Sequence, residues 1–370
     1  MDYDVRTLRS AAAESPDLVY TPFSEAEISV PPSPRFVFGE CTQELMARYY
    51  RENYTAPVGL YTASNVGVFG EALLIHGNTM LACDELEMTV GDLAAYRARY
   101  QAARGLLRPR MEAGQCVLLL GRGFGIYGHW LVDFLPKLFL LHQAGHDLMR
   151  LRYLVPRNAP KFGIDLLELL GITAEKRIAY HPDFELLCAD QLLVPTMARS
   201  SSRTSSLFRQ AVEFVTALIW RRNARPLVAG DTQRIFISRG RAGRPARNLL
   251  NRQQIERTAG AAGFRIVHPE QMSLLDQFAM FDNARQIVGE YGSALHAAIF
   301  ARPGATVCAL RGTGSEIAGF LQSGIGAALD LPTGYVFGPT IAGDRRDSFS
   351  VSEAALQSCI DLIFSGTPLA

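Results

Sequence analysis

The chain of 370 residues is long enough for two domains, and its 48% content of hydrophobic residues suffices for two buried cores. Its 37 basic and 36 acidic side chains leave a net charge of +1, which excludes a general attraction to nucleic acid or to an acidic membrane. Any binding of an anion must therefore depend on a local cluster of charge.

The cysteines and the amino terminus predict the compartment. The six cysteines are dispersed in mostly apolar sequence without a CxxC pair, which is typical of buried thiols in a reducing environment. The first ten residues show no basic segment followed by an apolar one, and no apolar run approaches the roughly 18 residues of a membrane helix. We expect a soluble, cytoplasmic protein, with any contact at the inner face of the membrane being peripheral.

The first part of the chain reads as an arm followed by strands. Residues 1–35 contain five prolines and little periodicity, which predicts an extended N-terminal arm. From residue 36 to about 81, alternating apolar positions interrupted by Gly and Asn predict a β-rich portion. A helix is then expected over residues 90–104.

From residue 116 the pattern changes to short apolar strands that alternate with longer helices, as in βα units on a parallel sheet. Strands are predicted over 116–120, 152–156 and 184–195, and helices over 127–145 and 161–171. These elements complete an N-terminal α/β domain over residues 36–198.

A polar run after residue 198 leads into an apolar helix and a Gly/Pro break, so we interpret residues 199–232 as a linker with a bridging helix. A second βα series predicts a Rossmann-like domain over 233–345, in which Ser273 caps a helix. Residues 346–370 predict a C-terminal helix. The fold class is therefore α/β, with two Rossmann-like parallel-sheet halves facing a cleft.

The first unusual cluster follows the strand predicted at 116–120. Gly123, Gly125 and Gly128 match GxGxxG, a loop that lets backbone approach a pyrophosphate, so NAD(P) binding by an oxidoreductase is one interpretation. The next predicted strand ends in Pro156, without the acidic residue that usually holds the ribose.

His129 and Asp133 follow the same glycines and lie four residues apart, on one face of the predicted helix. A paired imidazole and carboxylate at the end of an open sheet can supply a general base. The structural alternative is that His129 bonds a buried backbone group and Asp133 caps the helix before Pro136.

The second cluster is a run of arginines after the strand predicted at 234–239. Guanidinium groups suit phosphate, and such a loop lies at the carboxyl edge of a parallel sheet. Arg239 is closest to the strand end, and Arg244 follows in the loop. The alternative is an exposed basic loop.

The third cluster is a strand that runs through two glycines into a helix expected to begin near Ser293. Unpaired amides and the dipole of that helix would bind an anion. Glu290 is placed for a ribose or sugar hydroxyl, and His296 is either part of the site or a core histidine. The residues expected at the site are Gly289, Glu290, Tyr291, Gly292, Ser293, Ala294 and His296.

Other catalytic patterns are missing from the sequence. It contains no HExxH, Walker A or GxSxG motif, and its only DxD is Asp2 to Asp4 in the arm. His181, Asp183 and Glu185 read as a polar turn rather than as metal ligands. We expect no metal and no cofactor.

Together these clusters resemble a known family. The strings YGHWLVDFLPKL (127–138) and FRIVHPEQMSLLDQFAMFDNARQIVGEYGSALHAAIFARPG (264–304), with FISR and RNLLN between them, resemble the glycosyltransferase family 61 domain, also described as a capsular polysaccharide biosynthesis type of protein. The similarity extends over roughly residues 121–310. It implies a GT-B-like architecture and an inverting, metal-independent transfer from a nucleotide-sugar donor to a glycan or lipid-linked saccharide acceptor.

The resemblance also implies roles. Arg239 and the amides around Gly292 would hold the diphosphate in a nucleotide-sugar domain, while Asp133 or His129 would deprotonate the acceptor in the acceptor-side domain. The expected acceptor-side loop comprises Gly125, Tyr127 and Gly128.

The sequence departs from the family pattern at two positions. Members often carry His where this chain has Tyr291, and Asn where it has Ala297. A non-catalytic partner in polysaccharide assembly is therefore a further interpretation.

Overall fold

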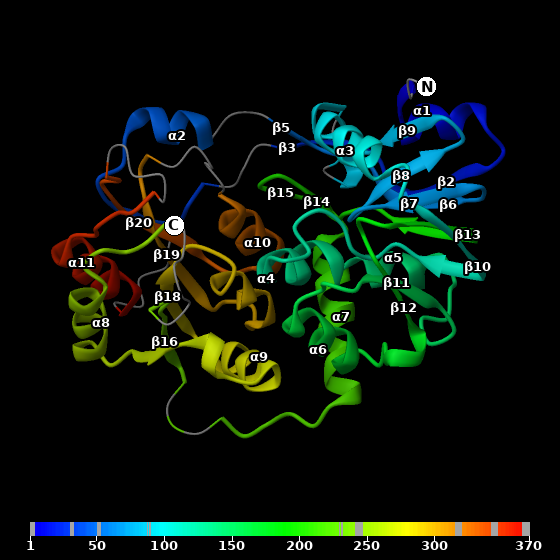
Figure 1. Cartoon of the computed structure of the whole chain (residues 1–370). Coiled ribbons are helices and arrows are strands. Elements are labelled where there is room, and N and C mark those ends of the chain that lie inside the picture. Colours follow the sequence, from blue (N-terminus) through cyan, green and yellow to red (C-terminus); the bar gives the residue numbers. More distant parts are fainter. Residues whose placement is uncertain are drawn as a thin grey trace. The chain divides into compact units, whose positions relative to one another are not determined.

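The computed structural model describes residues 4–29, 33–49, 53–86, 88, 90–228, 230, 232–240, 247–314, 320–341 and 347–364. The chain forms two compact units, each assembled from separate segments (Figure 1). The first unit comprises Met1–Glu27, Tyr54–Ser200 and Ser205–Asn223; the second comprises Ile28–Asn53, Ser201–Thr204 and Ala224–Ala370. Both are mixed α/β, as the sequence predicts.

The first unit is built on a mixed sheet of ten strands, in the order β1-β9-β8-β7-β13-β10-β11-β12, with β6 joining β13 to β2. Neighbours among β13, β10, β11 and β12 are parallel, whereas β6, β7 and β8 pair antiparallel to their neighbours. The strands are β1 (Asp4–Thr7), β2 (Leu18–Ser24), β6 (Val58–Ala63), β7 (Val66–Phe69), β8 (Leu73–His76), β9 (Thr79–Ala82), β10 (Arg108–Val117), β11 (Arg152–Pro156), β12 (Arg177–Tyr180) and β13 (Glu185–Pro195).

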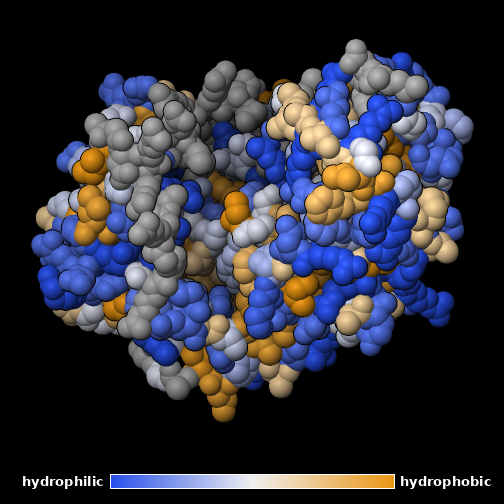
Figure 2. Space-filling model, viewed as in Figure 1, coloured by the Kyte–Doolittle hydropathy of each residue, from blue (hydrophilic) through white to orange (hydrophobic). Residues whose placement is uncertain are grey.

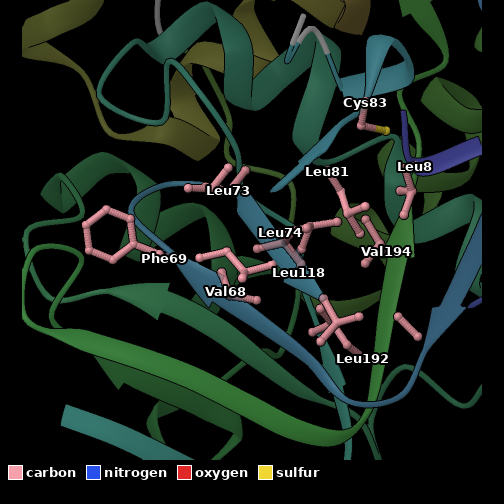
Figure 3. Packing of buried hydrophobic residues seen from close by; sticks show 14 of the residues in the cluster. Leu8, Val68, Phe69, Leu73, Leu74, Leu81, Cys83, Leu118, Leu192 and Val194 are labelled. Atoms are coloured by element: carbon pink, nitrogen blue, oxygen red, sulfur yellow. The ribbon is translucent and has the colours of Figure 1, made fainter. Parts of the chain in front are cut away.

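Apolar side chains of these strands form the core of the first unit. Figure 3 shows Val68, Leu74, Leu81 and Leu192, from four different strands, gathered in one cluster. The helices of the unit are α1 (Leu8–Glu14), α3 (Val90–Ala103), α4 (Tyr127–His129), α5 (Lys137–Gln143), α6 (Lys161–Leu169) and α7 (Phe208–Arg222), with a π-helix η2 (Trp130–Phe134) and 3₁₀-helices η1 (Asp84–Leu86) and η3 (Ala174–Lys176).

The second unit has a wholly parallel sheet in the order β17-β16-β18-β19-β20-β4. Its strands are β4 (Val37–Gly39), β16 (Arg234–Ile237), β17 (Arg265–Val267), β18 (Gln286–Glu290), β19 (Thr306–Gly312) and β20 (Thr333–Gly338). Counted from β16, the order is 2-1-3-4-5, so it reverses between β16 and β18. In open α/β sheets, ligands bind outside the carboxyl ends of the strands at such a reversal.

Helices of the second unit cover this sheet, and α8 and α11 lie side by side (Figure 1). Ile255 of α8 and Ile360 of α11 are buried in the same apolar cluster as Val288 of β18. The helices are α2 (Gln43–Tyr49), α8 (Arg252–Ala261), α9 (Leu274–Asn283), α10 (Leu321–Leu329) and α11 (Glu353–Phe364), with 3₁₀-helices η4 (Pro269–Gln271) and η5 (Leu295–Phe300). Four short strands complete the elements: β3 (Glu27–Ser29), β5 (Asn53–Thr55), β14 (Arg199–Ser200) and β15 (Arg203–Thr204).

The N-terminal segments differ from the extended arm and the boundary at residue 36 that we expected. β1 pairs with β9 and β2 with β6, so the arm is part of the first sheet. β4, in contrast, extends the second sheet by pairing with β20, which gives that edge a hydrogen-bonded neighbour. Phe36 is 6% exposed and lies against Gly334, where a Cβ atom would come within 2.2 Å of the ring.

Two further expectations differ from the structure. Helix α7 belongs to the first unit, where Ala211 packs with Leu140 of α5, so it is not a separate bridge between domains. Strand β10 begins at Arg108 rather than near residue 116, because its first half is largely exposed and polar and lacks the apolar pattern of a buried strand.

No helix in the described part of the chain is long and apolar enough to cross a membrane. On the face drawn in Figure 2, hydrophobic side chains occur in small groups between hydrophilic ones.

Replacement of Phe36 tests whether the N-terminal segment stabilises the second sheet. Phe36→Ala should destabilise the second unit by about 3 kcal/mol because it removes a buried ring. Amide hydrogen exchange should become faster in peptides from β19 and β20 but not in those from β10 and β13. Ile341→Ala, at a position that is 48% exposed, is the control and should change little. Faster exchange in the first unit instead would contradict the assignment.

Candidate functional site

One polar centre forms in the first unit where the carboxyl ends of β10 and β13 meet. These strands are parallel neighbours, with Val117 beside Leu193. The chain after β10 turns through residues 121–126 into α4, which carries His129, and the chain after β13 reaches Arg199. Two segments separated by some seventy residues are thereby brought to one edge of the sheet.

A π-turn interrupts the helix that carries Asp133, the carboxylate of this centre. Pro136 has no N–H to donate, and its ring disfavours a regular α-helix across this position. The Leu135 N–H bonds the Trp130 carbonyl at 2.9 Å, five residues back, so the helix widens over Trp130–Phe134 before α5 begins. Such π-turns are frequent at functional sites. The regular helix expected over 127–145 is therefore wrong in detail.

Asp133 lies between His129 and Arg199. Its Oδ2 atom is 2.5 Å from His129 Nδ1 and accepts a hydrogen bond of 2.6 Å from Arg199 Nη2, while Oδ1 contacts Arg199 Nε. The Asp133 side chain is 0% exposed and that of Arg199 is 5% exposed, whereas the His129 side chain is 30% exposed. Of the three groups, His129 is the one that a molecule in solvent can reach.

The charge of Asp133 follows from these neighbours. Burial alone would raise the pKa of the carboxyl, but the Arg199 guanidinium and the hydrogen bond from His129 hold it below its usual value. An ionised Asp133 accepts the Nδ1 proton of His129, which leaves Nε2 with its lone pair. This arrangement suits His129 for accepting a proton from a bound hydroxyl.

Gly123 has a packing role beside His129. Its φ of +84° is in the left-handed region, and a Cβ atom there would lie 2.7 Å from His129 Cδ2. The backbone thus lies directly against the imidazole, which explains this glycine of the GxGxxG string without a dinucleotide.

The other residues of the expected acceptor-side loop have different environments. Gly125 is exposed, Gly128 is buried, and the half-buried Tyr127 ring contacts Phe162 edge to face at 5.5 Å. Burial raises the pKa of the Tyr127 hydroxyl above its ordinary value.

Lys137 is a buried cation close to this centre. It is 1% exposed, and burial lowers the pKa of its ammonium group to about 8, against the opposing influence of Asp133 and Cys83. Its Nζ atom lies 5.6 Å from the centre of the Phe134 ring. Lys137 is therefore sensitive to the charge of the same carboxylate that positions His129.

A second centre forms in the second unit at the carboxyl ends of β16 and β18. The Glu290 carboxylate is 1% exposed and accepts hydrogen bonds from the Arg239 N–H at 2.9 Å and from Arg252 Nε and Nη2 at 2.7 and 2.9 Å. Glu290 is thus used to hold two arginine-bearing segments together, whereas we expected it to face a sugar hydroxyl.

Guanidinium groups crowd around Gly292. A Cβ atom on this glycine, whose φ is +150°, would lie 3.2 Å from Arg239 Nη1 and 3.7 Å from Arg247 Nη2. Burial and the charge of Arg247 both lower the pKa of Arg239. Like charges held this close favour an anion between them.

The aromatic ring of Tyr291 packs against two guanidinium groups. The guanidinium carbons of Arg247 and Arg311 lie 5.4 and 5.1 Å from the centre of its ring. His296 contacts the same ring edge to face at 5.7 Å, is 7% exposed, and pairs through Nδ1 with Gln322 Oε1 at 3.1 Å. This supports the alternative of a core histidine.

The helix expected at Ser293 is instead the six-residue 3₁₀-helix η5, preceded by the half-buried Ser293 and Ala294. So short a helix has little dipole, and the arginine side chains are the better anion ligands. Gly289 serves close strand packing, since a Cβ atom there would lie 2.7 Å from Ile237 Cβ. Arg244 lies outside the described residues.

Several residues of the two centres were missed by the sequence reasoning. Arg199 and Arg311 each follow or end a parallel strand, a position that could have marked them. Arg252 and Lys137 carry no comparable signal, because their roles depend on side-chain packing, whereas Arg247 belongs to the run of arginines that marks the second cluster in the sequence. Among the described residues, no three His, Cys, Asp or Glu side chains gather into a metal site.

A comparison with protein-family models identifies part of the chain. The family model described as Glycosyltransferase 61 matches residues 127–308, a segment that begins at α4 and ends in β19. Residues 127–308 belong to glycosyltransferase family 61. No match was found among the curated proteins. The family match indicates a glycosyltransferase, with a sugar donor and an acceptor as substrates.

Membership of family 61 does not support the oxidoreductase interpretation. The glycine string that suggested it lies largely before or at the start of the matched segment, and Gly123 serves contact with His129. The GT-B-like pairing of the two units stays a prediction.

Lys137 provides a pH test of the first centre. The pKa of Lys137 is lowered from its ordinary 10.5 to about 8, so above pH 8 the unfolded chain binds a proton that the folded protein does not. The free energy of unfolding should therefore rise between pH 8 and 10, by up to about 1.4 kcal/mol per pH unit. Urea unfolding of Lys137→Met should lack this rise.

The matched control is Lys161→Met, because the Lys161 side chain is 87% exposed. This variant should keep the pH dependence of the wild type. An equal pH dependence in the wild type and Lys137→Met would contradict the burial of a titrating lysine.

Proposed function

We propose that the protein is an inverting glycosyltransferase that moves a hexosyl or pentosyl group from a nucleotide-sugar donor to a hydroxyl of a glycan or lipid-linked saccharide. The observation that carries this proposal is the imidazole of His129, whose side chain is 30% exposed and whose Nδ1 atom is held by a buried, ionised carboxylate. Family membership supplies the reaction class, and the two centres supply its two chemical requirements, a base and an anion site.

His129 is the proposed base. As the acceptor hydroxyl attacks the anomeric carbon, its proton moves to Nε2 of His129, and Asp133 stabilises the imidazolium that forms. Asp133 is unsuited to contact the acceptor itself, because it is fully buried and both its oxygens face Arg199 or His129. Of the two bases left open by the sequence, we therefore favour His129.

Arg239 and Arg247 are the proposed ligands of the leaving group. Breaking the glycosidic bond leaves the shared electron pair on the nucleoside diphosphate, and nearby guanidinium groups stabilise that charge. Glu290 holds Arg239 in place by accepting its backbone N–H, and Arg252 in turn donates to the Glu290 carboxylate. These cations would do the work that a metal ion does in other transferases, so we propose a metal-independent reaction without a cofactor.

The test is a pair of variants with separate effects. With a panel of UDP-, GDP-, dTDP- and CMP-sugars, His129→Ala should lower turnover at least a hundredfold and leave the Kd of the nucleotide product unchanged. Arg239→Gln should lower turnover about a hundredfold and also weaken nucleotide binding at least tenfold.

His142→Ala is the control, because His142 is exposed on α5 away from Asp133 and should behave as the wild type. Near-normal turnover in His129→Ala would remove the base from this residue. Nucleotide binding by the wild type without turnover of any donor would favour the alternative of a non-catalytic partner in polysaccharide assembly.

A further inference from the structure

Tyr291 contacts three arginines of the second centre. Its backbone carbonyl accepts a long hydrogen bond of 3.5 Å from Arg239 Nη1, and the guanidinium carbons of Arg247 and Arg311 lie 5.4 and 5.1 Å from the centre of its ring. Tyr291 directly follows β18 and is 5% exposed. Its N–H donates to the Leu310 carbonyl of β19 at 2.9 Å, so the sheet fixes its backbone. One residue thus contacts cations from three separate segments of the chain.

An aromatic ring can hold a cation without cancelling its charge. A guanidinium above the face of a ring is attracted by the ring quadrupole, and the attraction is stronger where water is excluded. A carboxylate would attract the guanidinium more strongly, but it would also compete with an incoming anion for the same N–H donors. Arg252, paired with the buried carboxylate of Glu290, is in that situation. Arg247 and Arg311 pack on an uncharged ring.

Arg247 depends more on this ring than Arg311 does. The φ of Arg247 is +58°, in the left-handed region, which a residue other than glycine adopts at a cost in free energy. Surrounding contacts must therefore hold it there, and the Tyr291 ring is one of them. Arg311 is 3% exposed, and its guanidinium carbon also lies 5.0 and 5.9 Å from the ring centres of Phe320 and Phe337. Loss of the Tyr291 ring should therefore release Arg247 first.

The place of Arg247 matters because another guanidinium lies beside it. A Cβ atom on Gly292 would be 3.2 Å from Arg239 Nη1 and 3.7 Å from Arg247 Nη2, so both groups approach the backbone of this glycine. Burial and then the charge of Arg247 lower the pKa of Arg239. Before an anion binds, other contacts must oppose this repulsion, and Tyr291 contacts both arginines.

We propose that Tyr291 is a positioning residue, whose ring holds Arg247 in the second centre and leaves the charge of that guanidinium available to a bound diphosphate. The inference rests on the proposed function, in which Arg239 and Arg247 bind the leaving group. It adds the residue that prepares Arg247 for this role. The ring carries the effect, so the hydroxyl of Tyr291 should be dispensable.

Calorimetric titration of the full chain with inorganic pyrophosphate, UDP, GDP and CDP measures this effect. Tyr291→Leu, which removes the ring and keeps an apolar side chain, should weaken binding of pyrophosphate and of the preferred nucleoside diphosphate about tenfold. Tyr291→Phe keeps the ring and should stay within about twofold of the wild type. Phe364→Leu is the matched control. The Phe364 ring packs on the guanidinium of Arg234, at the start of β16 and so away from Arg239, and its loss should change neither affinity.

A double-mutant cycle distinguishes positioning from a general loosening of the fold. If Tyr291 acts by holding Arg247, the double variant with Tyr291→Leu and Arg247→Ala should bind pyrophosphate nearly as well as Arg247→Ala alone. Losses that multiply in the double variant would overturn the proposal. Unchanged binding in Tyr291→Leu, or a loss in Tyr291→Phe as large as in Tyr291→Leu, would also overturn it.

The proposal and the proposed function fail in different ways. Any of those three results, with a wild type that binds a nucleoside diphosphate, removes the role of Tyr291 and leaves the proposed function standing. If the wild type binds neither pyrophosphate nor any of the nucleoside diphosphates, both fail together. Should Tyr291→Leu not fold, as judged by its melting curve, Tyr291→Met fills more of the space of the ring and gives the same comparison.

Discussion

The ion pair between Asp133 and Arg199 is the interaction on which the first centre depends. Removing a carboxylate fully from water is costly unless a cation and hydrogen bonds replace the lost hydration, and Arg199 supplies both. Arg199 contacts both oxygens of Asp133, and the Oδ2 atom also pairs with His129 Nδ1. The imidazole is thus oriented by a charge that is itself fixed, while the His129 side chain as a whole stays 30% exposed. A base whose side chain had no fixed partner would not be held in one orientation toward the acceptor.

In the second unit, the strand order of the sheet determines where the site residues meet. A wholly parallel sheet whose order reverses between β16 and β18 leaves an opening at their carboxyl ends, and the residues that follow these strands must meet there. The Glu290 carboxylate, at the end of β18, accepts hydrogen bonds from the backbone N–H of Arg239 after β16 and from the side chain of Arg252 at the start of α8. The arginines are therefore held close to one another by backbone geometry, which opposes their mutual repulsion.

Much of the local organisation could be predicted from the sequence, because βα units have strong periodicity and their functional residues follow strand ends. The strands β11, β13, β16 and β18 and the clusters at His129, Arg239 and Glu290 were found in this way. Contacts between distant segments could not be predicted. The pairing of β4 with β20 joins residues some three hundred positions apart, and Arg199 meets Asp133 only after β10 and β13 pair. The π-turn before Pro136 and the shortness of η5 reflect local packing that periodicity does not encode.

Chemical rescue shows whether His129 takes the proton while Asp133 orients its ring. His129→Gly leaves a space beside Gly123 and Asp133 that free imidazole can enter. Turnover of this variant should be nearly abolished, and added imidazole should restore part of it in a saturable manner, with the nucleotide affinity unchanged throughout. Turnover close to that of the wild type, without any response to imidazole, would contradict this role of His129.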